Sequence, residues 1–249
     1  MTAASKDTWR IESLRLTLFW QVPAEPGYGA WAALTNEPPE TQSSTPRSHA
    51  VHEEGPFLTG VLSTDATPER TDVLLVVGSD ASPSEIPSLG EYPGTAGSFL
   101  TICSGWLAKQ DRGVKRVAFG VVARMPVAST RAGYDRLQAF LPAVTLSPDS
   151  SDFNYQINRR RTSTVEPSVQ INRLSRWSVV RLQYARIALD PLFRTAPAIL
   201  GDPAFACRCE LDLNTVAEFT GVLDVSTVVT VIDELKMLGS ELLEVGDVP

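Results

Sequence analysis

The chain has few of the residues that most often carry out chemistry in proteins. Its 249 residues include only two histidines, His49 and His52, and three cysteines, Cys103, Cys207 and Cys209. Histidine is the usual acid or base near neutral pH, so two histidines in one short segment leave little material for a catalytic triad. An odd, small number of cysteines excludes a disulfide framework and is typical of a reducing compartment.

Long apolar runs and a targeting segment are also lacking. No stretch approaches the roughly 18 apolar residues of a membrane-spanning helix, and Lys6, Asp7, Arg10 and Glu12 interrupt the place where a signal peptide is apolar. We therefore expect a cytoplasmic protein without membrane partners. Hydrophobic residues make up 43% of the chain and charged residues 20%, a composition typical of a folded globular protein.

Positive charge is scarce and is carried mainly by arginine. Lysine and arginine together number 22 against 29 acidic residues, which gives a net charge of −7, and only four of the 22 are lysine. A net negative chain is a poor match for nucleic acid over its whole surface, so we do not expect nucleic acid as a partner. Arginine does suit specific, paired contacts with carboxylates and phosphates.

The hydrophobic pattern predicts an α+β fold, mainly an antiparallel sheet with about three helices. Alternation of apolar and polar residues predicts strands at residues 13–22, 57–62, 73–77, 114–122, 153–161, 178–189 and 205–213. Helical spacing predicts helices at 97–110 and 129–141. A long amphipathic helix closes the chain, with a buried stripe formed by Val228, Ile232, Leu235, Leu238 and Leu242.

No change in composition divides the chain, so we expect a single domain, 1–249, with 147–152 as the place where two lobes would join. Residues 36–56 contain four prolines and little to bury, which predicts a mobile surface loop. The polar residues between the strands at 57–62 and 73–77 predict a connecting loop. Residues 80–97, rich in proline and glycine, predict another.

The most unusual segment lies between residues 155 and 195. The sequence QINR at 156–159 is repeated at 170–173, and Glu166-Pro167 between the copies is a turn signal, which predicts hairpin-like pairing of two similar strands. The segment contains eight arginines and two acids, a formal charge of +6. Residues 210–249 contain nine acids and one lysine, a formal charge of −8.

Three explanations of these arginines stay open. They pair with acidic helices of the same fold or lie on a solvated sheet face. Alternatively, the basic segment of one subunit binds the acidic C-terminal region of another, because complementary charges orient association. In the third explanation they bind phosphates of a nucleotide or nucleic acid, with Tyr155, Trp177 and Tyr184 stacking on bases. The candidate binding residues are Arg159, Arg160, Arg161, Arg173, Arg176, Trp177 and Arg181.

Three stretches resemble segments of uncharacterised bacterial proteins of about this length. They are FNYQINRRRTS followed by INRLSRWSV, VKRVAFGVVARMPV leading into a helix, and CRCELDLNT followed by an amphipathic helix. The resemblance covers residues 110–245. It implies a bacterial origin and supports the predicted elements, and it implies no activity, because none is known for the family.

Glu210 and Asp212 are the strongest candidates for catalysis. Residues 207–213 alternate, so Cys207 and Cys209 face the core while both carboxylates share the other face of the strand. Two carboxylates so placed can share a proton or hold magnesium. A metal-assisted hydrolase or phosphotransferase is therefore an alternative function, provided that Arg159–Arg161 lie across an open cleft and hold an anionic substrate.

Two weaker candidates are a zinc site at His49, His52, Glu53 and Glu54 and a phosphate site at Gly90, Gly94 and Gly97. Neither spacing matches a known motif, so we expect solvated loops at both and no metal or cofactor.

The main functional prediction is a non-catalytic bacterial interaction or assembly protein. It would use the Arg-rich segment, 155–195, and the acidic C-terminal region to bind a protein partner or a second copy. The hydrolase described above is one alternative. Binding of a nucleotide or nucleic acid through the arginines is the other.

Overall fold

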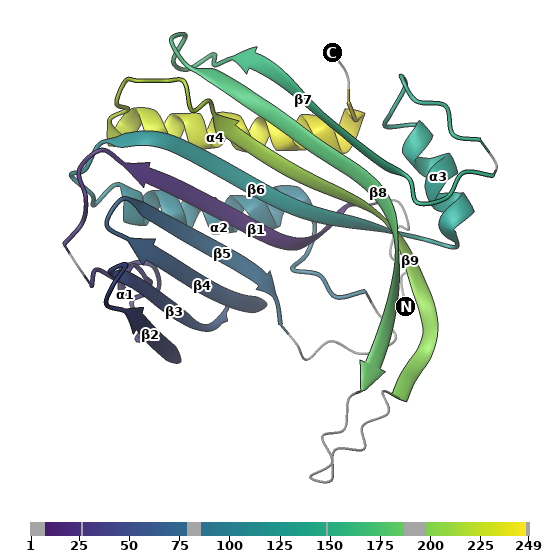
Figure 1. Ribbon diagram of the computed structural model, residues 1–249, viewed down its shortest axis with the longest axis horizontal. Coiled ribbons are helices and arrows are strands. Elements are labelled where there is room, and N and C mark those ends of the chain that lie inside the picture. The colour runs from purple at the N-terminus through teal and green to yellow at the C-terminus, as the bar shows by residue number, and fades with distance from the viewer. Residues whose placement is uncertain (1–7, 26, 79–85, 148, 187–197, 248–249) are drawn as a thin grey trace.

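The computed structural model describes residues 8–25, 27–78, 86–147, 149–186 and 198–247 (Figure 1). One antiparallel sheet contains every strand, in the order β2-β3-β4-β5-β1-β6-β9-β8-β7. The strands of the described chain are β1 (Arg10–Trp20), β2 (Thr41–Thr45), β3 (Ala50–Phe57), β4 (Gly60–Thr67), β5 (Arg70–Val77), β6 (Val114–Val127), β7 (Asn154–Thr162), β8 (Gln170–Arg186) and β9 (Ala198–Thr215). Its helices are α1 (Trp31–Thr35), α2 (Tyr92–Leu107), α3 (Thr130–Gln138) and α4 (Val225–Val245).

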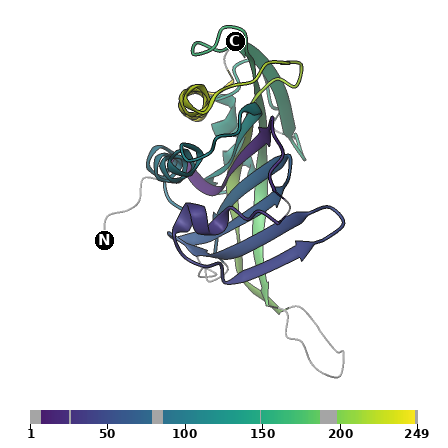
Figure 2. The ribbon, with the colours of Figure 1, turned by 90° about the vertical axis from the view of Figure 1, so that its left-hand side faces the viewer.

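The helices lie on one face of the sheet. The two long helices, α2 and α4, run side by side behind the central strands (Figures 1 and 2). The short helix α1 contacts α2, and α3 contacts β6, β8 and β9 near one end of the sheet. Over the opposite face the described residues place no helix (Figure 2), and we call this the open face.

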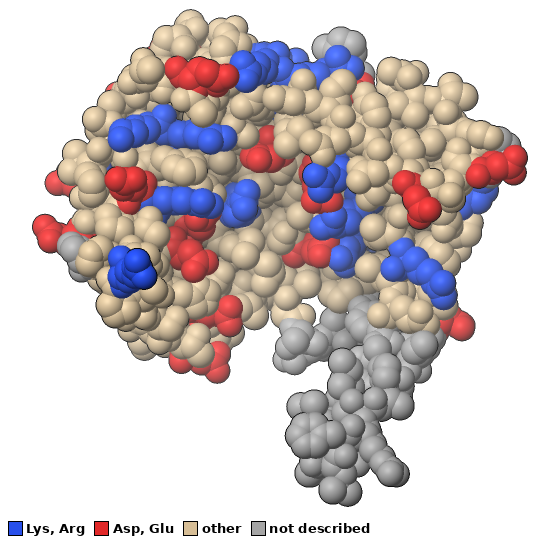
Figure 3. All heavy atoms as spheres, in the orientation of Figure 1, with Lys and Arg blue, Asp and Glu red and all other residues tan. Residues whose placement is uncertain are grey.

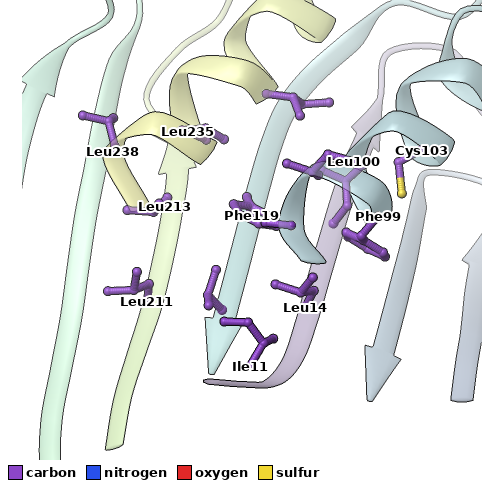
Figure 4. Packing of buried hydrophobic residues seen from close by; sticks show 14 of the residues in the cluster. Ile11, Leu14, Phe99, Leu100, Cys103, Phe119, Leu211, Leu213, Leu235 and Leu238 are labelled. Carbon is purple, nitrogen blue, oxygen red and sulfur yellow. The ribbon is translucent and has the colours of Figure 1, made fainter. Parts of the chain in front are cut away.

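Apolar side chains between the sheet and the helices form the core. Leu14 on β1, Phe119 on β6 and Leu211 on β9 point from the central strands towards Phe99 on α2 and Leu235 on α4 (Figure 4). This packing explains why apolar and polar residues alternate in these strands, because every second residue of each strand faces the core. The three cysteines are buried, as the sequence predicts for them.

Apart from the edge strand β2, the two halves of the sheet have the same topology, which the sequence does not reveal. Each half has a central strand, a short helix, a meander of three strands and a long helix. These are β1, α1, β3 to β5 and α2 in the first half, and β6, α3, β7 to β9 and α4 in the second. Because β1 and β6 pair at the centre, the surface above them lies at the junction of the two halves.

The predicted fold class needs correction. The chain is largely one nine-stranded antiparallel sheet with helices at its side, 44% strand and 24% helix, and the described residues contain four helices rather than about three. The additional helix, α1, has five residues and is too short to produce a periodic pattern. Strands from both sides of residues 147–152 belong to the same sheet.

The loops predicted at 36–56 and between 62 and 73 are also wrong. Residues 36–56 contain β2 and most of β3, while β4 and β5 extend to leave only a two-residue turn at 68–69. The alternation of apolar and polar residues does not reveal β3, because its inward positions include a glycine and the buried carboxylate of Glu53. Glu53 accepts hydrogen bonds from the Trp31 backbone N–H, at 2.9 Å, and from the Thr64 hydroxyl, at 3.0 Å.

Candidate functional site

Two of the candidate arginines lie on the helical face of the sheet, where they pair with acidic residues of the same chain. Arg159 donates two hydrogen bonds to Asp247, just beyond the end of α4, from Nε at 2.6 Å and Nη2 at 3.1 Å. Arg161 donates two to Glu241 on α4, at 3.2 and 3.3 Å. The acidic C-terminal region therefore neutralises part of the basic segment within one molecule.

Arg173 and Trp177 also face inwards. Arg173 is 2% exposed and lies 3.6 Å from Glu241. Trp177 is fully buried, stacked on Phe140 and edge-on to Trp9. Because the indole lies in the core, it is not available to stack on a base or another ligand.

The Asp247 carboxylate links the C-terminus to β7, and its loss is expected to destabilise the fold. Burial raises its pKa, but hydrogen bonds from Arg159 and from the Tyr155 hydroxyl, at 2.9 Å, outweigh burial and hold the pKa below its usual value. A lowered native pKa contributes stability above the ordinary pKa, and this contribution disappears as the pH falls through the native value.

We expect Asp247→Asn to lower the free energy of unfolding by about 1.5–3 kcal/mol at neutral pH, because a neutral amide weakens the hydrogen bonds that the buried Asp247 carboxylate accepts from Arg159 and Tyr155. Urea denaturation at pH 7 and in steps down to about pH 2 measures the effect, since the difference from the wild type should shrink through the acid range. Asp233→Asn, at an exposed position on α4, is the matched control. A loss that is the same at every pH would contradict this assignment.

Of the remaining candidates, Arg160 and Arg176 lie on the open face, whereas the register pairs Arg181 with Phe205, on the same side of β8 as Trp177. Arg160 contacts Glu218, at 3.0 Å, and Arg176 donates to Gln156, at 2.8 and 3.0 Å. Arg181 is exposed. Arg194 lies outside the described residues, as do the side chains of Tyr184 and Arg186. The three consecutive arginines at 159–161 are thus divided between two faces and do not form one site.

On the open face, side chains form rows that cross the central strands. The register places Leu74, Arg15, Gly120, Asp212 and Leu174 opposite one another on β5, β1, β6, β9 and β8. The adjacent row contains Val76, Ser13, Val122, Glu210, Arg176 and Gln156. Glu210 and Asp212 therefore share one face, as predicted, and that face is not the one covered by the helices.

A hollow of about 320 Å³ lies over these two rows. Its lining includes Ser13, Arg15, Gly120, Arg176, Glu210 and Asp212. The space-filling view of this face shows blue and red groups interspersed, with no extended patch of one sign (Figure 3). The hollow contains equal numbers of acidic and basic side chains, so its formal charge is balanced.

Gly120 opens the middle of the hollow. A Cβ placed on it would lie 3.6 Å from Cβ of Arg15 and 3.7 Å from Nε of Arg15. The Arg15 side chain therefore passes over Gly120, from β1 towards β9. A larger residue at 120 would occupy this space, which explains the use of glycine inside a strand.

The charged groups of the hollow differ in how far they are already paired. Glu210 contacts Arg208 and also lies 3.8 Å from Arg176. Arg208 and Arg124 share Glu12, at 3.5 and 2.5 Å.

Arg15 and Asp212, in contrast, form no ion pair with any described residue. The Arg15 side chain makes no hydrogen bond to the described chain either, and the Asp212 carboxylate accepts one, from the Asn214 side chain at 2.9 Å. They are the two charged groups of the hollow that have no oppositely charged partner among the described residues.

The proposed zinc and phosphate sites are not assembled. His52 points to the open face and contacts Asp65 at 2.8 Å, whereas Glu53 points to the helical face of the same strand. Across the described residues, no three His, Cys, Asp or Glu side chains gather in a way that could hold a metal ion. Gly94 and Gly97 lie within α2 rather than in a loop, which corrects the loop predicted at 80–97.

Comparison of the chain with models of known protein families, and with curated proteins, gives no match. The resemblance to uncharacterised bacterial proteins therefore stays a prediction, and the site has to be interpreted from its own geometry.

Sequence reasoning found Glu210 and Asp212 but not Arg15 or Gly120. Arg15 stands between Leu14 and Leu16 on a strand where the alternation of apolar and polar residues shows only which face is buried. A signal for Gly120 was present, since a glycine in an otherwise apolar strand marks a close approach of another group. Arg15 and Gly120 become neighbours only through the register of β1 with β6, and no local sequence pattern predicts that register.

Proposed function

We propose that this chain is a non-catalytic binding protein that holds a small charged ligand in the hollow of the open face. The observation that carries the proposal is the placement of Arg15 and Asp212, unpaired within the described chain, on either side of Gly120. Small-molecule sites are concave and combine a few convergent polar groups with apolar walls. Here Leu74, Val122 and Leu174 supply the apolar walls.

An interaction protein that assembles through its basic and acidic segments is less well supported. Arg159 and Arg161 already pair with Asp247 and Glu241 within one chain, so these charges are not available to a second copy. The mixed charge of the open face does not favour nucleic acid, which requires a surface of one sign.

The hydrolase alternative rests on Glu210 and Asp212, which do face an open hollow. Arg159 and Arg161, which this alternative requires to bind the anionic substrate, lie on the other face of the sheet and cannot reach the hollow. Glu210 already contacts Arg208 and lies 3.8 Å from Arg176, so it is less available than Asp212 to a metal or a substrate. Binding without catalysis is therefore the better supported function.

A cytoplasmic location belongs to the same proposal. The thiols of Cys103, Cys207 and Cys209 are free and buried, as suits a reducing compartment. None of the described helices combines the length and apolar character that a membrane crossing needs.

Filling the hollow is expected to abolish ligand binding without unfolding the protein. We propose to screen amino acids, carboxylates, amines and phosphates by thermal denaturation at about 10 mM, at which a ligand with a Kd of about 0.1 mM stabilises by about 2.7 kcal/mol. For a chain of this length that corresponds to an increase in Tm of about 5–10 °C. Gly120→Leu should lose this response, because the leucine side chain projects into the hollow.

Gly120→Ala is the matched control for this screen. Its added Cβ would make only ordinary contacts of 3.6–3.8 Å, so it should fold and keep most of the response. The proposal is contradicted if no compound stabilises the wild type, or if one stabilises Gly120→Leu as much as the wild type.

A further inference from the structure

We infer that the ligand of the hollow is a free α-amino acid with an uncharged side chain, bound with its carboxylate on Arg15 and its ammonium group on Asp212. This rests on the proposed function, which states only that a small charged ligand binds there. The inference depends on the position, spacing and surroundings of these two side chains.

The first step is the match of charge. Arg15 and Asp212 are opposite in sign, and neither pairs with another described residue. The other two charged groups of the hollow face each other on adjacent strands, Arg176 on β8 and Glu210 on β9. A ligand with one positive and one negative group would therefore satisfy both free groups and leave the hollow neutral. A purely anionic ligand such as a nucleotide would face two carboxylates.

The second step is the spacing of the two groups. Arg15 and Asp212 stand on strands separated only by β6, and adjacent strands lie about 4.8 Å apart, so their backbones are about 10 Å apart. Much of this distance is spanned by the Arg15 side chain, whose Nε already lies over Gly120. Arg15 and Asp212 form no direct ion pair, so the space between them is left for a ligand, and the reach of the Arg15 side chain over β6 favours a ligand whose two charges sit on one carbon.

The third step is the chemistry of each contact. A guanidinium presents a planar pair of N–H donors that matches a carboxylate, which makes Arg15 the carboxylate receptor. Asp212 can accept from an ammonium group, because Asn214 donates to only one of its oxygens, Oδ1. Asn214 is itself held by Arg116, at 2.9 Å, and Asn172, at 3.0 Å, so the carboxylate is supported by a network on β6, β8 and β9.

The fourth step concerns the ligand side chain. The row that contains Arg15 and Asp212 ends in Leu74 and Leu174, and Val122 lies in the next row. The walls available to a side chain are thus aliphatic. The hollow, at about 320 Å³, is at the lower end of the roughly 300–1,000 Å³ of small-molecule sites, which suits a single amino acid.

Titration calorimetry of the full chain with L-leucine and three analogues tests the inference. Leucine amide lacks the carboxylate, N-acetyl-leucine lacks the ammonium group, and 6-aminohexanoate carries both charges further apart. We expect leucine to bind, and each analogue to bind about tenfold to a hundredfold more weakly, as for loss of a hydrogen-bonded charged contact.

Two variants assign each contact to its partner. Arg15→Gln should weaken leucine binding by a similar factor but leave leucine amide unaffected, because the amide has no carboxylate to lose. Asp212→Asn should weaken leucine but leave N-acetyl-leucine unaffected. Double-mutant cycles of this kind isolate the pairwise contact. Arg181→Gln, an exposed arginine outside the hollow, is the control and should bind leucine like the wild type.

The possible outcomes separate this inference from the proposed function. It is overturned if amino acids do not bind, or if Arg15→Gln and Asp212→Asn bind leucine as the wild type does. If a phosphate or a carboxylate binds instead, and Gly120→Leu abolishes that binding, then the proposed function stands while the amino-acid assignment fails. If no compound shows binding that depends on Gly120, both fail.

Discussion

Gly239→Ala is expected to destabilise the protein by about 2–3 kcal/mol, a large effect for the addition of one methyl group. Gly239 lies in α4 where the helix crosses the start of α2. A Cβ at this position would lie 2.2 Å from the Tyr92 hydroxyl oxygen and 3.4 Å from Cδ1 of Leu213. Tyr92 is 3% exposed and donates to the Lys236 carbonyl oxygen at 2.9 Å, so its ring cannot simply turn away.

Removing the tyrosine hydroxyl should relieve this clash. Tyr92→Phe alone is expected to cost about 1–2 kcal/mol through its lost hydrogen bond. In the double variant Gly239→Ala with Tyr92→Phe, the nearest clashing atom is gone, so the total loss should be clearly smaller than the sum of the two single losses. Urea denaturation of the four proteins measures this coupling.

A second glycine provides the control for helix propensity. Gly105 lies in α2 with no atom within 4 Å of an added Cβ. Gly105→Ala should therefore stabilise the protein by about 0.5–1 kcal/mol, because alanine favours helix and nothing opposes it. If Gly239→Ala were equally stabilising, then the close packing of α2 on α4 at this point would be wrong.

The parts of the fold that the sequence predicts best are those in which one face is buried. β1, β6, β9 and α4 each place apolar residues at the period of their structure, because each covers the core on one side only. β2 cannot be found in this way, since all five of its residues are exposed at the edge of the sheet. The symmetric order of the strands is equally hidden, because pairing is a long-range property.

The candidate site shows the same division between local and long-range information. Alternation places Glu210 and Asp212 on one face of their strand, and the structure agrees. The same rule, applied to Arg159, Arg160 and Arg161, separates the middle arginine from its neighbours, so the hydrolase hypothesis is wrong to place all three at one cleft. Arg15 lies almost two hundred residues from Asp212 in the chain, and only the order β1-β6-β9 brings them to one hollow.

The second large effect is expected at Glu234, a buried carboxylate that fixes the connection between β7 and β8 to α4. Glu234 is 3% exposed and accepts three hydrogen bonds, from the Ser163 hydroxyl at 2.6 Å, the Thr164 N–H at 2.7 Å and the Thr164 hydroxyl at 2.8 Å. The Ser163 hydroxyl oxygen in turn accepts from the backbone N–H groups of Val165 and Glu166. One carboxylate therefore organises the whole turn.

Glu234→Ala is expected to lower the free energy of unfolding by about 3 kcal/mol or more at neutral pH, because it leaves buried donors without an acceptor. Glu234→Gln should cost less but still destabilise, since its amide turns a donor towards donors. Glu244→Gln, exposed on the same helix, should have no measurable effect. Urea denaturation compares the three variants with the wild type.

The acid dependence of this loss identifies the carboxylate as its source. Burial raises the pKa of Glu234, but the hydrogen bonds from Ser163 and Thr164 outweigh burial and hold the pKa below its usual value. The stabilisation is therefore present in full above the ordinary pKa of a glutamate and is lost as the pH falls through the native value. The difference between the wild type and Glu234→Gln should shrink over that acid range, because protonation gives the wild type a neutral group as well. At neutral pH, hydrogen exchange in Glu234→Gln should be accelerated most at the amides of Thr164, Val165 and Glu166, while exchange in β1 and β6 should rise only by the smaller factor that the global loss of stability gives. Acceleration by the same factor at the turn and in β1 and β6 would contradict a local role for Glu234.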